Sequence, residues 1–188
     1  MKLIVGLGNP GPEYALTRHN LGFLVLSHLG RLLGIPLTKQ NLISSWGQGE
    51  VNGEPVVLAQ PLTYMNNSGS AVKWLLNHWG LPTAALIVIH DDLDVPFGRL
   101  KLTAKGGAGG HRGVASIIAA LDSDEFYRVK LGLGRPPPGI APEDFVLSPF
   151  SPEEHQHLAD LVDRAAQAVI VLTNLGLAAA QARFHRPL

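Results

Sequence analysis

The sequence of 188 residues contains no cysteine, and this absence excludes several functions. Without thiols, the chain has no disulfide scaffold, no thiolate zinc site and no cysteine nucleophile. Long apolar runs are missing too. No stretch approaches the roughly 20 residues that a membrane-spanning helix needs, and glycines interrupt the apolar N-terminus before it reaches the length of a signal peptide. We therefore expect a soluble, cytoplasmic protein without a membrane partner.

The chain also lacks net charge, because 15 Lys and Arg residues balance 15 Asp and Glu residues. Bulk charge therefore does not indicate a nucleic-acid partner. The basic residues are nevertheless unevenly distributed: residues 95–121 hold no acidic side chain and four basic ones, Arg99, Lys101, Lys105 and Arg112. Charge alone explains this segment equally well as an anion-binding surface or as an ordinary solvated strand face.

Several hydrolase motifs are absent as well. The sequence has neither the G-x-S-x-G of serine hydrolases nor the H-E-x-x-H of zinc proteases. The glycine-rich loop at 105–113 could expose backbone amides to an anion, but it lacks the spacing of a nucleoside-triphosphate loop. If the chain is a hydrolase, water is the expected nucleophile.

Strand-like and helix-like apolar patterns alternate along the chain and predict the α/β class. We expect strands near 2–7, 43–51, 56–60, 85–90, 100–104 and 129–133, and helices near 21–33, 68–80, 113–121 and 151–176. Asn52-Gly53 predicts a hairpin, so the sheet should be mixed. The length suits one core, and we predict a single domain over 1–188, a mixed twisted sheet flanked by helices.

Three local features complete this prediction. Ser68 is expected to cap the second helix. Residues 136–150, which begin with three prolines, are predicted to form a lid loop. The tail, residues 183–188, is expected to be loosely ordered.

Gly6, Gly8 and Gly11 match the G-x-G-x-x-G pattern of dinucleotide sites, but the surrounding residues disfavour such a site. Pro10 removes an amide donor from the loop, and no acidic residue lies about 20 positions beyond the last glycine to bind a ribose. A tight turn that directs the Asn9 carboxamide over the sheet edge fits better.

The candidate chemical groups are a histidine and an acidic cluster. His19 lies in a polar stretch before the first helix, and an imidazole suits general-base work near neutral pH. The other histidines, His111 included, are weaker candidates. His90-Asp91-Asp92-Leu93-Asp94 follows a buried strand. It is compatible with a divalent-metal cluster, with one carboxylate that orients His19, or with a plain turn.

Five motifs together resemble bacterial peptidyl-tRNA hydrolases over nearly the whole chain. They are Gly6-Leu-Gly8-Asn9-Pro10-Gly11, Thr17-Arg18-His19-Asn20, Thr63-Tyr64-Met65-Asn66-Asn67-Ser68-Gly69, His90-Asp91-Asp92-Leu93-Asp94 and Gly109-Gly110-His111. The resemblance implies a monomer that cleaves the ester between a peptide and the terminal ribose of tRNA, recycling tRNA from prematurely released peptidyl-tRNA. It implies neither a metal nor an organic cofactor, and its partner is peptidyl-tRNA.

The resemblance also implies roles for individual residues. His19 matches the catalytic base and Asp91 its orienting partner. The positions that match substrate-binding residues are Asn9, Tyr64, Met65 and Asn66. The tRNA phosphates are expected near Arg99, Lys101, Lys105 and Lys130. Arg112 departs from the family, which usually has Asn there. It could bind a phosphate or a carboxylate, or mark a weakened relative that only binds RNA.

Overall fold

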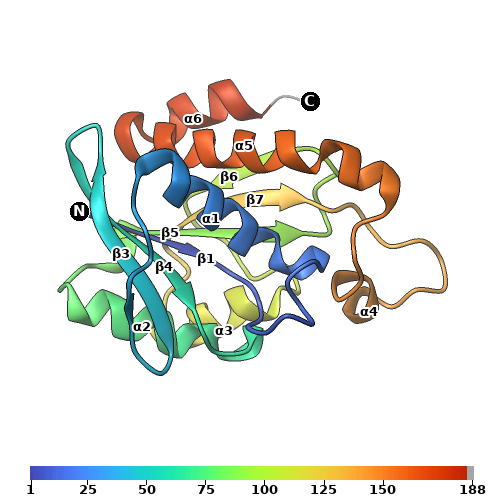
Figure 1. Ribbon diagram of the computed structural model, residues 1–188, viewed down its shortest axis with the longest axis horizontal. Coiled ribbons are helices and arrows are strands. Elements are labelled where there is room, and N and C mark those ends of the chain that lie inside the picture. The colour runs from blue at the N-terminus through green and yellow to red at the C-terminus, as the bar shows by residue number, and fades with distance from the viewer. Residues whose placement is uncertain (186–188) are drawn as a thin grey trace.

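One seven-stranded mixed sheet forms the centre of the computed structural model, which describes residues 1–185 (Figure 1). Its order is β2-β3-β4-β1-β5-β7-β6. The strands are β1 (Lys2–Gly6), β2 (Lys39–Gln40), β3 (Ser44–Val51), β4 (Glu54–Pro61), β5 (Leu86–Asp92), β6 (Leu100–Thr103) and β7 (Tyr127–Gly132). β4, β1, β5 and β7 run parallel, whereas β3 and β6 pair antiparallel with their neighbours. The predicted mixed sheet is confirmed.

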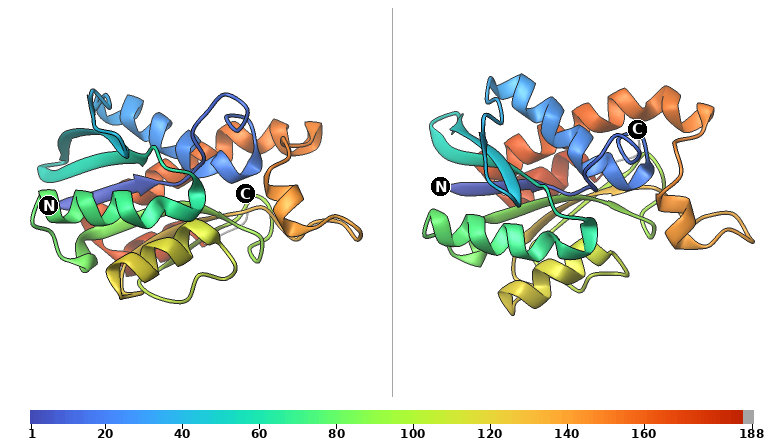
Figure 2. Two further views of the ribbon diagram at one scale, coloured as in Figure 1. Left: turned by 90° about the horizontal axis from the view of Figure 1, so that it is seen from below. Right: turned by 60° about the horizontal axis from the view of Figure 1, so that its bottom comes forward.

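Helices cover both faces of this sheet (Figures 1 and 2). One face carries α1 (Leu21–Leu33), α5 (Pro152–Leu175) and α6 (Leu177–Phe184), and the other carries α2 (Ser68–His78) and α3 (Arg112–Leu121). Along β1 and β5, successive side chains alternate between the two cores: Ile4 and Ile87 belong to one core, and Leu3 and Val88 to the other. A strand that is buried on both sides needs such an unbroken apolar run.

Local sequence signals account for the element boundaries that were predicted well. Asn52 and Gly53 both have positive φ, 48° and 89°, as a two-residue hairpin turn requires. Ser151 forms a capping box with Glu154 at the start of α5. None of the helices in residues 1–185 has the length and apolar character needed to cross a membrane.

Two local predictions were wrong. Ser68 does not cap α2: its hydroxyl donates to the carbonyl of Met65 at 2.8 Å, because the 3-10 turn η2 (Met65–Asn67) already winds the chain into the helix. The loose tail is contradicted at Arg183 and Phe184, which lie in α6. It is contradicted at His185 as well, because Nε2 of His185 accepts from the backbone amide of Leu102 at 2.8 Å. Residues 186–188 lie outside the described residues.

The predicted lid loop, which we call the lid segment (residues 136–150), contains a short helix that the sequence did not reveal. This helix, α4 (Pro142–Val146), lies at the carboxyl end of the central strands, apart from the two helical layers (Figure 1). It begins with Pro142 and two acids, a favourable helix start.

Close backbone packing explains two of the glycines in the N-terminal half. A Cβ at Gly22 would lie 2.5 Å from the carbonyl oxygen of Ile89, and a Cβ at Gly6 would lie 2.4 Å from the carbonyl oxygen of Gly22. These glycines let α1 sit directly on the ends of β1 and β5. The first α-helix begins only at Leu21, after a turn-rich segment and the 3-10 turn η1 (Arg18–Asn20), which is not the strand–loop–helix geometry of a dinucleotide site.

Candidate active site

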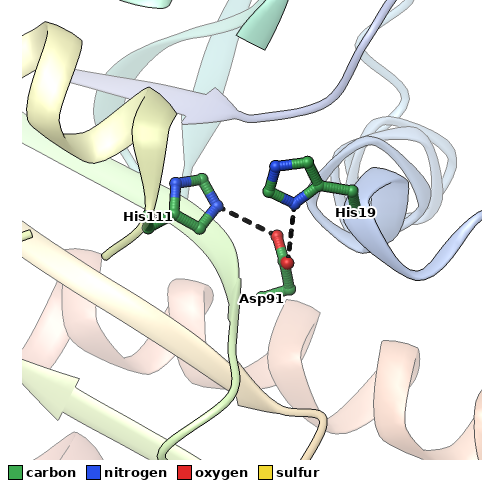
Figure 3. Close-up of side chains that lie close together, drawn as sticks. All are labelled: His19, Asp91 and His111. Carbon is green, nitrogen blue, oxygen red and sulfur yellow. Dashed lines mark hydrogen bonds and ion pairs between the residues drawn. The ribbon is translucent and has the colours of Figure 1, made fainter. Parts of the chain in front are cut away.

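His19 and Asp91 lie in hydrogen-bonding contact at the carboxyl end of the sheet. η1 carries His19, and β5 carries Asp91 as its second-last residue. Nδ1 of His19 lies 2.8 Å from Oδ2 of Asp91 (Figure 3). The two residues are 8 % and 2 % exposed, so solvent weakens the contact little.

His111 contacts the same carboxylate from the opposite side (Figure 3). Its Nε2 lies 3.0 Å from Oδ1 of Asp91, and its ring centroid lies 4.9 Å from that of His19. Sequence reasoning ranked this histidine among the weaker candidates. The sequence signal that could have identified His111 as a site residue was its place in the Gly109-Gly110-His111 motif.

The hydrogen-bond network assigns the tautomers of both histidines. Nδ1 of His111 accepts from the amide of Val114 at 3.2 Å, so the proton of His111 is on Nε2 and points to Asp91. An ionised carboxylate only accepts hydrogen bonds, so Nδ1 of His19 donates to it and Nε2 of His19 keeps its lone pair. His19 is thereby set up as a base.

Electrostatics keep Asp91 ionised. Burial alone would raise the pKa of Asp91, but the neighbouring His19 and His111 outweigh it and hold that pKa well below its usual range. His90, beside them, is enclosed, and burial lowers its pKa to about 3. His90 donates from Nδ1 to the carbonyl of Asp91 at 2.7 Å, while its Nε2 has no partner in residues 1–185.

Asn9 is oriented by backbone and side-chain contacts. Its Oδ1 accepts from the amide of Met65 at 2.7 Å, and Asn20 forms two hydrogen bonds of 2.9 Å with the Asn9 backbone. With Oδ1 occupied in this way, the NH₂ group of Asn9 is the part of the carboxamide that is left to donate. Asn20 is a second positioning group to which the sequence prediction gave no role.

The structure brings most of the predicted site residues to one cleft of about 490 Å³. The predicted residues that line it are Asn9, His19, Met65, Asn66, Asp91 and Arg112. Tyr64 is not among the lining residues. It is 57 % exposed and packs edge-to-face on Tyr14, with ring centroids 6.3 Å apart.

The acidic cluster does not form a three-carboxylate metal site. Asp92 lies 3.8 Å from Nζ of Lys130, and Asp94 pairs with Arg135. The donor atoms of His19, Asp91 and His111 do lie within 4.8 Å of one another, close enough to hold a metal ion. Both oxygens of Asp91, Nδ1 of His19 and Nε2 of His111 share the hydrogen bonds described above, whereas Nε2 of His19 stays free.

The predicted phosphate-binding residues lie outside the cleft lining. Lys101 on β6 stands directly opposite Lys130 on β7, a like-charged pair in which Asp92 offsets only the charge of Lys130. Arg99, Lys101 and Lys105 are exposed, whereas the Lys130 side chain is only 16 % exposed. Burial lowers the pKa of Lys130, and Asp92 opposes that effect.

A buried arginine anchors the glycine-rich loop beside the cleft. Arg128 is fully buried and donates to the carbonyls of Gly107, at 2.7 Å, and Asp124, at 2.9 Å. Its guanidinium lies 4.3 Å from the ring centroid of Phe126. The first half of the loop is therefore tied to β7.

The family model for peptidyl-tRNA hydrolase matches residues 3–188. The chain belongs to the peptidyl-tRNA hydrolase family. It is similar to the peptidyl-tRNA hydrolase of Desulforudis audaxviator, with 49 % identity over 98 % of this chain and 93 % of that protein. The peptidyl-tRNA hydrolase of Carboxydothermus hydrogenoformans is 46 % identical over 99 % of both chains.

Solved structures agree with this assignment. A crystal structure of peptidyl-tRNA hydrolase from Acinetobacter baumannii has a TM-score of 0.92 and 33 % identity, and covers all of this chain and 95 % of that one. As a member of the peptidyl-tRNA hydrolase family, the protein is a hydrolase that acts on ester bonds of peptidyl-tRNA.

Proposed function

We propose that this peptidyl-tRNA hydrolase cleaves its ester with a water molecule that His19 activates, without a metal ion. The observation that carries the proposal is the hydrogen bond between His19 and Asp91 in the cleft, which leaves Nε2 of His19 as the free base. Asp91 holds the imidazole in that tautomer and favours the imidazolium that forms during the reaction.

The reaction can proceed by direct attack of water, without a covalent intermediate between enzyme and peptide. Nε2 of His19 takes a proton from water, and the hydroxide adds to the ester carbonyl. The tetrahedral intermediate then breaks its bond to the terminal ribose oxygen, which leaves with the proton from His19. The products are a tRNA with its terminal ribose hydroxyl restored and the free carboxylic acid of the peptide, which ionises at neutral pH and releases its proton to solvent.

Two carboxamides are suited to stabilise the oxyanion. Asn9 is held by Met65 and Asn20 with its NH₂ group left to donate, and Asn66 lies exposed in the same cleft. A donor directed at a developing oxyanion contributes about 3 kcal/mol to transition-state stabilisation. Met65 supplies an apolar wall of the cleft, and the exposed ring of Tyr64, the residue before it, is a further contact for the substrate.

We further propose that the tRNA backbone lies along Arg99, Lys101, Lys105 and Lys130, and that Arg112 contacts an anionic group of the substrate. The facing Lys101–Lys130 pair supports an anion there. Arg112 is exposed in the cleft and begins α3, where a cation is disfavoured by the helix dipole. The protein acts as a cytoplasmic monomer in this proposal.

The decisive experiment is His19→Ala assayed on peptidyl-tRNA. Cleavage should be abolished while tRNA binding stays within about twofold, because His19 acts on the water and not on the phosphates. His28→Ala is the matched control, since His28 also pairs with a carboxylate, Asp163 at 2.8 Å, but on α1 and α5 outside the cleft lining.

Two outcomes would contradict the proposal. Retained turnover by His19→Ala would refute the base assignment. If the intact protein binds RNA in a salt-sensitive way but does not cleave peptidyl-tRNA, the alternative suggested by Arg112 would be favoured, namely a relative that only binds RNA.

A further inference from the structure

Arg18, the residue before His19, is buried, although arginine is rarely enclosed unless it is paired. Its side chain is 8 % exposed and forms a salt bridge with Glu154 on α5, with Nη2 2.5 Å from Oε1. Its Nε lies 3.4 Å from the second carboxylate oxygen. The planar guanidinium thus contacts the two oxygens of one carboxylate through two separate nitrogens, which the single nitrogen of a lysine cannot do.

The same guanidinium binds the lid segment. Its Nη1 donates to the carbonyl of Phe145 in α4 at 3.2 Å, and it lies 4.0 Å from the centroid of the Phe145 ring. The backbone amide of Arg18 donates to Ser148 at 3.0 Å, and Thr17 forms a β-bridge with Pro149. The end of the lid segment is therefore fixed to the residues next to His19.

Glu154 joins these contacts to the start of α5. Its Oε1 also accepts from the backbone amide of Ser151 at 2.8 Å, as part of the capping box. Burial would raise the pKa of Glu154, but the hydrogen bonds from Arg18 and Ser151 outweigh it and lower that pKa. The carboxylate stays ionised, and Arg18 therefore bridges the start of α5 and the lid segment.

We propose that Arg18 is a positioning residue that couples the placement of α4 to the placement of His19 against Asp91. α4 and the residue after it line the cleft through Pro142, Glu143, Val146 and Leu147. α4 cannot shift without breaking the bond from Arg18 to Phe145, and Arg18 cannot shift without moving its neighbour His19. The inference rests on the proposed role of His19 as the base.

Substitution of Arg18 should therefore lower kcat more than it raises KM. A misplacement of about 1 Å at a reacting group costs on the order of a hundredfold in rate. We expect kcat to fall about a hundredfold in Arg18→Met and about tenfold in Arg18→Lys, which keeps the charge but loses the two-nitrogen contact with Glu154. KM should change less than about threefold in both variants. Glu154→Gln should have an intermediate effect, and Glu153→Gln, its exposed neighbour, none.

A second measurement separates positioning from a general loss of structure. In folded Arg18→Lys, the imidazole N–H signal of His19, assigned by its absence in His19→Ala, should shift or broaden. Amide exchange should rise together in residues 17–20 and 142–150, while the strands keep their protection. Arg18→Lys serves this purpose if Arg18→Met does not fold.

The possible failures are distinguishable. Unchanged kcat and an unchanged His19 signal in Arg18→Lys, with His19→Ala inactive, would overturn the coupling alone. Faster exchange at 142–150 without any change at 17–20 would overturn it as well. Cleavage by His19→Ala would refute the base assignment, and the spectroscopic readout would still decide whether Arg18 links the two segments.

Discussion

Nδ1 of His19 lies 2.8 Å from Oδ2 of Asp91, although 72 positions separate the two residues in the chain. β5 delivers the carboxylate at the end of a buried strand, and η1 delivers the imidazole just before α1 begins. Their distance therefore depends on how closely α1 approaches the sheet, and thus on backbone packing as well as on side chains.

Asp91→Asn should lower kcat by a factor of about 10² to 10⁴, because the carboxamide keeps one acceptor oxygen and replaces the other with an NH₂ group that must face one of the two imidazoles. An imidazole that faces this NH₂ group must accept at that nitrogen and move its own proton elsewhere. His111 needs the oxygen, because its Nδ1 accepts from the Val114 amide and its proton is therefore on Nε2. The NH₂ group then faces His19, whose proton moves to Nε2, so the base is lost. Steady-state kinetics on peptidyl-tRNA test this prediction, and near-normal kcat in a folded Asp91→Asn protein would contradict it.

His111→Asn should lower kcat about tenfold and should destabilise the fold through the lost hydrogen bond to Asp91, but not through a lost helix cap. Asn is a favoured N-cap, so α3 keeps its capping interaction, which His111 now supplies to Val114. The variant loses the donor to Asp91, a charge-assisted hydrogen bond of about 1.5–3 kcal/mol. Kinetics with a parallel urea titration measure both effects. Full activity would show that one imidazole is enough to hold the Asp91 carboxylate.

Lys101→Ala should weaken tRNA binding and reduce the slope of log K against log salt concentration by about 0.7–0.9, the value of one phosphate contact. The control is Lys39→Ala, because Lys39 lies exposed on β2, at the opposite edge of the sheet. Binding assays between low and moderate salt give both slopes. Equal slopes for the two variants would place the tRNA elsewhere.

The stability of the protein should fall as the pH decreases from 6.5 to about 3, in part because of His90. The unfolded chain protonates His90 near pH 6.5, whereas burial lowers the folded pKa to about 3. Protons therefore favour unfolding in this window, by about 1.4 kcal/mol per pH unit for one group. His90→Asn should flatten this dependence in urea titrations, and exposed His157→Asn should not. The same slope in both variants would rule His90 out.

The sequence predicted the elements whose signals are local. The central strands followed from unbroken Val/Ile/Leu runs, the hairpin from Asn52-Gly53 and the start of α5 from Ser151 and Glu154. α4 escaped prediction because five residues are too few to show a helical period. Ser68 was misassigned because a 3-10 turn ahead of α2 leaves no marked pattern of its own.

Partners far apart in the chain were the harder part of the site. His19 and Asp91 were connected by family likeness and by the need for an acceptor. The glycine motif before His111 marks that residue as part of the site, but it does not indicate that the ring turns toward Asp91. Arg18 is the clearest case, since its carboxylate partner lies 136 positions away. A buried cation has no pattern in the sequence that distinguishes it from a solvated one.

The close packing at Gly22 limits which residues this enzyme can carry at that position. Any side chain there would meet the carbonyl of Ile89, two residues before Asp91, and would lift the start of α1 away from the sheet. The base would then retreat from its carboxylate even though neither had been altered. Gly22 takes no part in the reaction, but it determines how close His19 comes to Asp91. We therefore expect no residue other than glycine to be tolerated at position 22.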